Sequence, residues 1–352
     1  MSKIKIGITI GDMNGISPEV IIKALAHPKM TDFFIPIIYG SSKILSYHKN
    51  IVNDPNFNFI SIGHPDNVSY NKVNVFNVVE GDVNISLGQP SEESGRIAMA
   101  ALKQATEHAI EGHLDAIVTA PINKAAMEMA GFGYVGHTEY LTEAFSAPET
   151  VMTMVSENLV ISLVSNHIPV LKLADSINKK TIIRKLKILS KSLKQDFAFE
   201  RPTIGVLGLN PHAGDGGVIG DDEESYIKPA IKEAKNNGVL ASGPYPSDGF
   251  FGSGNFRKVN AIMAMYHDQG LIPFKLLSFG SGVNFTAGLP VIRTSPDHGT
   301  AYDIAGKNIA NGESMRQALF LAKDLYLNRK QYIEDGKDPI KKEPKPQEEI
   351  QE

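Results

Sequence analysis

The sequence predicts an α/β fold in which helices cover a largely parallel β-sheet. Two observations carry this prediction. Short apolar runs alternate with longer segments of helical period, and loops containing Gly, Pro and polar residues follow the apolar runs. With 352 residues, the chain is long enough for two domains or for one large α/β unit.

The individual elements follow from the period of their apolar residues. Buried strands are predicted at Ile4–Ile10, Phe34–Tyr39, Ala116–Thr119, Leu159–Val164, Thr203–Leu209 and Ala261–Met265. Helices are predicted at Pro18–Ala26, Glu92–Ile110, Lys179–Gln195, Glu223–Asn236 and Ser314–Asn328. Residues 334–352 are charged and nearly free of apolar side chains, so we expect a disordered tail there.

The composition narrows the functional classes. No apolar run reaches the roughly eighteen residues that a membrane span needs, and the N-terminus lacks the apolar centre of a signal peptide, so we expect a cytoplasmic protein without a membrane partner. The net charge of −4 gives no general attraction for nucleic acid, and the lysine-rich segment 179–194 is interpreted as a solvated helix face. Because the chain has no cysteine, a metal site must use His, Asp or Glu.

Polar residues gather where the predicted strands end. These strand-end segments read APINK at 120–124, SNHIP at 165–169, NPHAG at 210–214 and YHDQG at 266–270, and DHGT at 297–300 follows the run at 292–295. Loops at the carboxyl ends of strands form the ligand crevice of open α/β sheets. The sequence therefore predicts a shared site made by these loops.

Three of the strand-end histidines, His167, His212 and His267, are candidate metal ligands. Three neutral imidazoles suit zinc, cobalt or a similar divalent ion. Their wide separation leaves open that they are unrelated structural histidines. The histidines in helical or irregular contexts are interpreted as structural, namely His27, His48, His64, His108 and His113.

Phosphate binding has no standard motif in this chain. A P-loop is absent, and the glycines of segment 214–220 have the spacing GxGxxxG, which fails as a dinucleotide fingerprint. Basic and hydroxyl side chains nevertheless recur beside the predicted site: Lys124, Thr138, Lys275 and Arg293. Together they have the chemistry to hold a phosphate and a carboxylate, and Arg293 suits a planar bidentate contact.

Seven ordered motifs give the sequence a specific resemblance. They are TIGDMNGISPE at 9–19, TAPINK at 119–124, GHTE at 136–139, LNPHAG at 209–214, MYHDQG at 265–270, GVNFT at 282–286 and RTSPDHGT at 293–300. With these motifs the chain resembles the 4-hydroxythreonine-4-phosphate dehydrogenase family of pyridoxal phosphate biosynthesis. The resemblance spans residues 3 to about 328.

The resemblance implies a fold and an assembly. The family is similar in fold to isocitrate and isopropylmalate dehydrogenases, with two α/β/α domains around a central cleft. The first domain is expected at 1–125 and 290–333, the second at 126–289 with the dimer interface, and the tail at 334–352. The family forms a homodimer in which the metal site is shared between subunits.

The resemblance also implies roles for individual residues. The metal ligands fall on His167, His212 and His267, and the metal is expected to be zinc, cobalt or magnesium. The substrate contacts fall on His137, Thr138, Lys275, Asn284 and Arg293. The NAD (or NADP) contacts fall on Asn284, Asp297 and Thr300.

The implied reaction is the NAD-dependent oxidation of 4-phosphohydroxy-threonine, followed by decarboxylation. It needs a metal to acidify the hydroxyl, a cationic pocket for the phosphate, and a base, for which Lys275 and Asp248 are the candidates. The chain departs from the usual pattern at GDMNGISPE, at SNHIP and around Asp248 in PSDGFF, without losing a proposed ligand. These departures bear on the choice of substrate more than on the reaction class.

Three alternatives remain to be separated by assay. A paralogue that oxidises phosphorylated threonate or erythronate would use the same metal, cofactor and phosphate contacts. A metal-dependent hydrolase would release phosphate without forming NADH. A metabolite-binding protein would be stabilised by its ligand without turnover.

Overall fold

The computed structural model describes residues 3–278 and 280–337, and it is organised around one twelve-stranded sheet. The strand order is β3-β4-β2-β1-β5-β12-β11-β6-β7-β10-β8-β9. The strands are β1 Lys5–Thr9, β2 Ile35–Gly40, β3 Phe59–Ile62, β4 Val73–Asn77, β5 Ala116–Thr119, β6 Val151–Ser156, β7 Leu159–Leu163, β8 Thr203–Leu207, β9 Leu240–Tyr245, β10 Ala261–Ala264, β11 Val283–Ala287 and β12 Ile292–Pro296.

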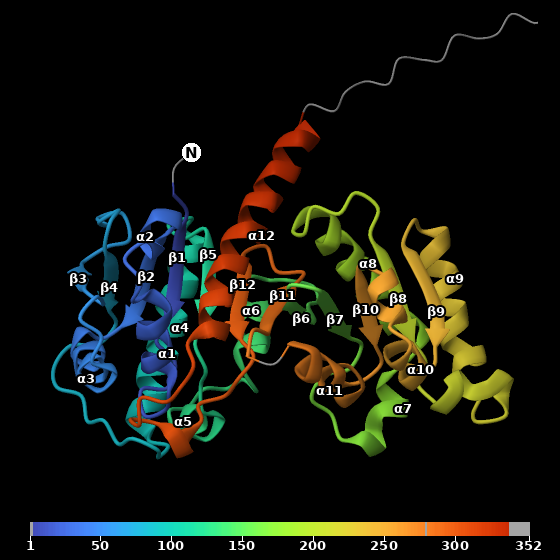
Figure 1. Ribbon diagram of the computed structural model, residues 1–352, viewed down its shortest axis with the longest axis horizontal. Coiled ribbons are helices and arrows are strands. Elements are labelled where there is room, and N and C mark those ends of the chain that lie inside the picture. Colours follow the sequence, from blue (N-terminus) through green and yellow to red (C-terminus); the bar gives the residue numbers. More distant parts are fainter. Residues whose placement is uncertain (1–2, 279, 338–352) are drawn as a thin grey trace, which may run out of the picture.

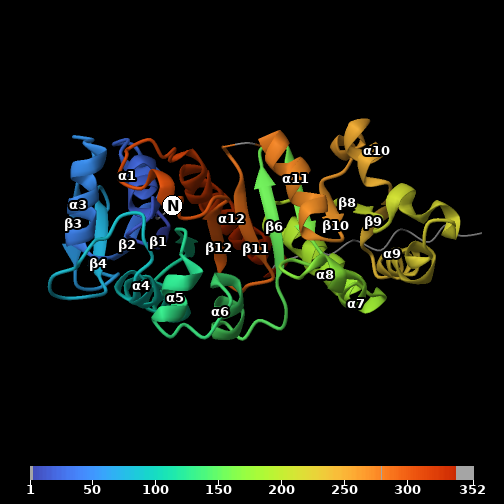
Figure 2. The same ribbon diagram turned by 90° about the horizontal axis from the view of Figure 1, so that it is seen from below.

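The sheet has two parallel flanks joined by antiparallel strands. From β3 to β12 every neighbouring pair is parallel, and so are the pairs from β7 to β9. The pairs β12–β11, β11–β6 and β6–β7 are antiparallel. Figures 1 and 2 show the N-terminal flank in blue at one end, the second flank in yellow at the other, and β12, β11 and β6 between them.

Helices pack on both faces of the sheet. They are α1 Ser17–Leu25, α2 Met30–Phe33, α3 Ser42–Val52, α4 Glu92–Ile110, α5 Lys124–Met129, α6 His137–Ala144, α7 Leu173–Ser176, α8 Lys179–Gln195, α9 Lys228–Asn236, α10 Ser247–Gly252, α11 His267–Ser278 and α12 Glu313–Lys337. Short 3-10 or π turns lie at Val170–Lys172, Pro211–Gly217, Glu223–Ile227, Asn255–Lys258 and Tyr302–Ile304. Within the described residues, no helix combines the length and the apolar content that a membrane crossing requires.

The amphipathic helices form where their apolar stripes indicate. In α4 the side chains of Ile97, Ala101 and Ala105 are buried, and Ser91 caps the helix by accepting the Ser94 N–H at 3.1 Å. In α8 the buried stripe includes Ile182, Leu186 and Leu189, and most of the lysines are exposed as expected. Lys185 is an exception, since its ammonium donates to the Thr150 carbonyl at 2.7 Å. The predicted α/β class is therefore confirmed, and each predicted strand and helix is present.

Helix α12 connects the two flanks. Its buried residues pack on β12 and α1, and the Thr294 hydroxyl donates to the Ala318 carbonyl at 2.8 Å. Near its end, Arg329 donates to Asp196 at the end of α8, with an Nε–Oδ1 distance of 2.6 Å. The helix continues to Lys337, so the predicted disorder is wrong for residues 334–337. Residues 338–352 of the predicted tail lie outside the described part of the chain.

Candidate active site

A cavity of about 320 Å³ lies over the antiparallel strands that join the two flanks. In the sheet register, Asn284 of β11 lies opposite both Met154 of β6 and Ser295 of β12. Because alternate residues of a strand share a face, Met152 and Arg293 join the same surface, and all five residues line the cavity. This patch of the sheet forms the floor, and the walls come from strand-end loops, α6 and α11.

Arg293 is the buried cation of the floor. Its side chain is 3% exposed. Nε and Nη2 donate to the Thr119 hydroxyl at 3.1 and 2.6 Å, and Nη1 donates to the Thr286 hydroxyl at 3.0 Å. Burial lowers the pKa of Arg293 to about 10, so the guanidinium stays charged at neutral pH. Two of the five N–H groups of an arginine remain for a ligand, which makes this an anion site.

The N-terminus of α6 points at the same cavity. Gly136 caps the helix without a side-chain bond, and His137, Thr138 and Glu139 of the first turn all line the cavity. Free backbone N–H groups and the helix dipole favour an anion here. Burial and the nearby Arg293 hold the pKa of His137 well below its usual value, so this imidazole is neutral. Its Nε2 is buried and finds no partner among the described residues.

One stripe of α11 forms another wall. His267, Leu271 and Lys275 are spaced four residues apart and all line the cavity. The ammonium of Lys275 lies 3.5 Å from the Asp297 carbonyl oxygen. Burial raises the pKa of the Asp297 carboxyl, and the charge of Lys275 opposes this shift. Lys275 and Asp297 therefore face each other across one end of the cavity.

Two of the three predicted metal ligands meet in the cavity. The rings of His167, after β7, and His267, at the start of α11, lie with centroids 5.6 Å apart. Burial, with further contributions from Lys124 and His267, lowers the pKa of His167, so the ring is neutral at neutral pH and one of its nitrogens has a free lone pair. Nδ1 of His267 lies 2.7 Å from Oδ1 of Asp268, which orients that ring.

His212 lies apart from these two rings. It is exposed, and it does not line the cavity. Its loop has positive φ from His212 to Gly217, and the buried carboxylate of Glu223 holds the loop by accepting the N–H groups of Leu209 and Asn210 at 2.7 and 2.8 Å. A Cβ at Gly214 would lie 2.5 Å from Glu223 Oε2, so the turn requires glycine there. Within one chain, the described residues therefore do not bring the three histidines together.

Some of the predicted cofactor and base residues line the cavity, and others lie outside it. Asn284 and Asp297 line the cavity, and the buried Oδ1 of Asn284 has no partner among the described residues. Thr300 does not line the cavity; its carbonyl instead accepts the Ile16 N–H at 2.9 Å. Asp248, the second predicted base, is exposed on α10 and also lies outside the cavity of this chain. Lys275 is therefore the predicted base that the cavity contains.

Several residues at the site were not assigned a role from the sequence. Thr119 and Thr286 hold Arg293, and Glu139 and His298 line the cavity. Behind it, the buried Asp12 accepts the Tyr302 hydroxyl at 2.5 Å, and the Asp12 N–H donates to the Pro121 carbonyl at 2.9 Å. These bonds join the loops after β1, β5 and β12. The motifs TIGDMNG and TAPINK contain Asp12 and Pro121, but the spacing of the motifs does not predict the hydrogen bonds that these residues make.

The structure is that of an α/β protein whose parallel flanks and strand-end loops form a cleft. A buried guanidinium and the N-terminus of α6 line this cleft, and both are groups that suit an anion. The particular family follows from comparison with known proteins. The family model described as "Pyridoxal phosphate biosynthetic protein PdxA" matches residues 32–322, and the chain belongs to this family.

Curated relatives and solved structures agree with this assignment. The chain is 46% identical over 343 residues to a "4-hydroxythreonine-4-phosphate dehydrogenase" of Bacteroides thetaiotaomicron, covering 97% of this chain and 94% of the relative. It is 37% identical to a "Putative D-threonate 4-phosphate dehydrogenase" of Oceanobacillus iheyensis, covering 91% and 97%. A crystal structure of 4-hydroxythreonine-4-phosphate dehydrogenase from Klebsiella pneumoniae is 36% identical and superposes with a TM-score of 0.82, covering 92% and 98%.

Proposed function

We propose that the protein oxidises 4-phosphohydroxy-threonine with NAD to 2-amino-3-oxo-4-phosphooxybutanoate, which loses carbon dioxide to give 3-amino-2-oxopropyl phosphate for pyridoxal phosphate biosynthesis. The observation that carries the proposal is the cavity itself. It is lined by the Arg293 guanidinium, by the N-terminus of α6 and by the imidazole rings of His167 and His267. The names of relatives up to 46% identical support the same substrate.

Substrate positioning falls to the anion-binding side of the cavity. The free N–H groups of Arg293 and the first turn of α6 suit the phosphate, with the Thr138 hydroxyl beside them. His137 is neutral, and its buried Nε2 has no partner among the described residues, so it suits a hydrogen bond to the substrate. Fixing the phosphate at one end sets the position of the reacting carbon at the other.

The metal and the cofactor are assigned to chain groups that fit them chemically. His167 and His267 offer imidazole nitrogens on one side of the cavity, and His212 would be the third ligand, for zinc, cobalt or magnesium. Bound to these residues, the metal would supply a Lewis acid to lower the pKa of the substrate hydroxyl, and NAD would supply the hydride acceptor. Asn284 and Asp297 are the cavity residues proposed to contact NAD, and Lys275 is the proposed base.

We further propose that the protein is a homodimer in which His212 enters the cavity of the other subunit. Large apolar side chains are exposed within nine residues of each of the three histidines in the sequence. Val170 and Leu171 follow His167 and are 75% and 97% exposed, Val218 follows His212 at 82%, and Leu276 of α11 is 79% exposed. A second copy covering these side chains would explain both their exposure and the distant His212.

An assay of NADH formation with 4-phosphohydroxy-threonine, run with and without a chelator, tests the proposed function. We expect turnover that the chelator removes and that a divalent metal restores. Phosphate release without NADH would indicate the hydrolase alternative, and thermal stabilisation without turnover would indicate a binding protein.

The relative from Oceanobacillus iheyensis favours one second candidate substrate, phosphorylated threonate or erythronate. These acids lack the amino group but carry the same phosphate. Parallel measurements of kcat/KM on the amino and amino-free acids separate the two. A strong preference for the amino-free acid would overturn the proposed substrate and leave the dehydrogenase chemistry standing.

A further inference from the structure

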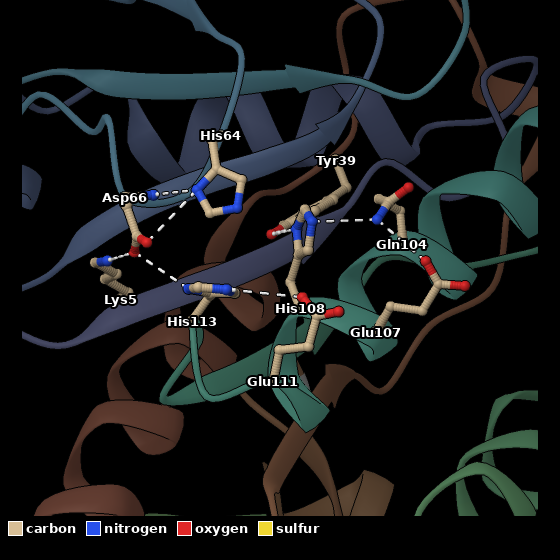
Figure 3. A network of polar contacts seen from close by, with 9 residues as sticks. All are labelled: Lys5, Tyr39, His64, Asp66, Gln104, Glu107, His108, Glu111 and His113. Atoms are coloured by element: carbon tan, nitrogen blue, oxygen red, sulfur yellow. Dashed lines mark hydrogen bonds and ion pairs between the residues drawn. The ribbon is translucent and has the colours of Figure 1, made fainter.

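A second group of histidines lies outside the cavity, in the N-terminal flank. His64, Asp66 and His113 each offer one ligand atom that lies within 4.8 Å of those of the other two. Figure 3 shows the two rings on either side of the Asp66 carboxylate, with Lys5 and Glu111 next to them. We call His64, Asp66 and His113 the outer triad.

The outer triad comes from two connections that meet at one end of the flank. His64 and Asp66 lie in the connection from β3 to β4, and His113 lies between α4 and β5. Lys5, which contacts Asp66, is the first residue of β1. The triad thus lies near the amino ends of β1 and β5, whereas the cavity uses the carboxyl end of β5. None of its three residues lines the cavity.

The nitrogen and oxygen atoms of the outer triad face one another. The Asp66 N–H donates to Nδ1 of His64 at 3.2 Å, so this nitrogen carries a lone pair and no proton. The same Nδ1 lies 3.6 Å from Asp66 Oδ2, and Nδ1 of His113 donates a hydrogen bond to Asp66 Oδ1 at 3.2 Å, since a carboxylate only accepts. Both Nδ1 atoms therefore face one carboxylate, and small side-chain rotations would bring the three atoms to metal-binding distances of about 2 Å.

Glu111 provides the support that a ligating histidine usually has. Nε2 of His113 lies 3.7 Å from Glu111 Oε2. A metal bound at Nδ1 would displace the proton that Nδ1 donates to Asp66, and the proton left on Nε2 would face the Glu111 carboxylate. The third ring of this region, His108, is already bound to the Tyr39 hydroxyl through Nδ1 at 2.8 Å, and it packs on His64 and His113 with centroids 5.7 and 6.0 Å away.

Lys5 is the cation that now neutralises Asp66. Its Nζ lies 3.0 Å from Oδ1, which leaves Oδ2 unoccupied by the ammonium. The Asp66 side chain is 54% exposed and that of His64 is 43% exposed, so an ion from solvent has access. Lys5 competes with a metal for the carboxylate without blocking the second oxygen.

We propose that the outer triad binds one divalent transition-metal ion of the zinc type, through Nδ1 of His64, Nδ1 of His113 and the Asp66 carboxylate. Two imidazoles and one carboxylate suit Zn²⁺ or Co²⁺ better than Mg²⁺ or Ca²⁺, which prefer oxygen alone. The ion ties the β3–β4 connection to the segment before β5, so its role is structural. His64 and His113, interpreted as structural from the sequence, become ligands in this proposal.

The test counts Zn²⁺ ions and records Co²⁺ absorption in a full-length chain carrying His212→Ala, which removes the metal proposed for the cavity. We expect one equivalent of metal to remain, and we expect it to be lost when His64→Gln and His113→Gln are added. Asp66→Asn alone should weaken Zn²⁺ binding at least tenfold. His27→Gln, at an exposed histidine outside the triad, is the matched control and should keep the equivalent.

A further variant asks whether the ion contacts Asp66. Lys5→Gln removes the competing ammonium, so it should tighten Zn²⁺ binding and raise the unfolding temperature in the presence of Zn²⁺. Circular dichroism and gel filtration check that every variant is folded. The proposal is overturned if the triad variants keep the same metal content as the control, or if Lys5→Gln leaves the affinity unchanged. The cavity metal is measured separately through turnover, so either assignment can fail alone.

Discussion

The two histidine groups of this chain differ in how they are assembled. His64, Asp66 and His113 come from short connections at one end of one flank and converge within a single chain. His167 and His267 come from loops of the second flank and meet in the cavity, whereas His212 stays outside it. One group is complete in the subunit, and we propose that the other is completed between subunits. A site made at an interface ties activity to assembly, and a site made inside one subunit does not.

Of the substitutions that test this difference, His212→Ala is expected to have the largest effect on metal binding and turnover. Changing His212 to Ala should remove the cavity metal and abolish turnover without unfolding the chain, because the side chain is exposed. Metal content, NADH formation and circular dichroism measure the three quantities. A variant that is fully active and lacks metal would refute the ligand assignment.

Arg293 tests the anion side of the cavity. Arg293→Lys should lower kcat/KM about 100-fold, mainly through KM, because a lysine cannot hold both Thr119 and Thr286 and still reach a phosphate. Steady-state kinetics on the phosphorylated substrate measures this. Arg316→Lys, which changes an arginine paired with Glu313 outside the cavity, is the control.

A buried histidine of the N-terminal flank, His48, should make the fold less stable in acid. It is buried, and its Nε2 bonds the Met13 carbonyl in the loop after β1. Burial lowers its pKa to about 4 in the folded chain, against 6.5 as the ordinary value. Between these two values the unfolded chain binds a proton at His48 that the folded chain does not bind. The free energy of unfolding is therefore highest above pH 6.5 and falls as the pH is lowered toward 4.

His48→Gln should therefore reduce the acid sensitivity of the fold. A glutamine can still donate to the Met13 carbonyl but cannot be protonated. We expect the loss of unfolding free energy between pH 7 and pH 4.5 to shrink by about 2 kcal/mol. Urea unfolding at the two pH values measures it, with His27→Gln as control. An unchanged pH dependence would show that His48 is not the group responsible.

Hybrid dimers distinguish a shared cavity site from one built within a subunit. Inactive His212→Ala and His267→Ala chains, mixed at random, should recover about a quarter of normal activity, because half of the dimers are mixed and each has one intact site. His167→Ala mixed with His267→Ala should recover none, since both rings line the same cavity of one chain. No recovery from verified His212 and His267 hybrids would argue against sharing.

The smallest effect is expected at the outer triad. His64→Gln with His113→Gln should change kcat and KM by less than about twofold, because the triad residues do not contribute to the cavity. Steady-state kinetics with saturating Zn²⁺ measures this. A large loss of activity would mean that the two groups are coupled, contrary to the comparison.

The apolar period of the sequence predicted the buried strands of both flanks and the long helices. It did not predict β3, β4, β6, β9, β11 or β12 as strands. β3 is mostly half-exposed, and β6 and β11 pair antiparallel at the centre, where the chain returns after long detours. The last helix was predicted to end near Asn328, but Arg329 binds Asp196 and the helix continues to Lys337. The apolar period of a helix cannot predict a contact between residues that are so far apart in the sequence.

The candidate site shows the same division. Motifs located the strand-end loops, and the cavity contains His137, Thr138, Lys275, Asn284 and Arg293 as expected. Spacing could not show that Thr119 and Thr286 occupy three N–H groups of Arg293, since these residues meet only through the sheet register. Nor could it show that His212 and Asp248 lie outside the cavity of their own chain, because that depends on where whole loops are placed.

The order of the strands has a consequence for how the chain is made. β12 lies between β5 and β11 in the sheet, although it is the last strand in sequence. On the ribosome, the N-terminal flank must wait with an open edge at β5 until nearly all of the chain has emerged. An unpaired edge of this kind can accept a strand from another nascent chain, which makes this stage of synthesis the one most exposed to aggregation.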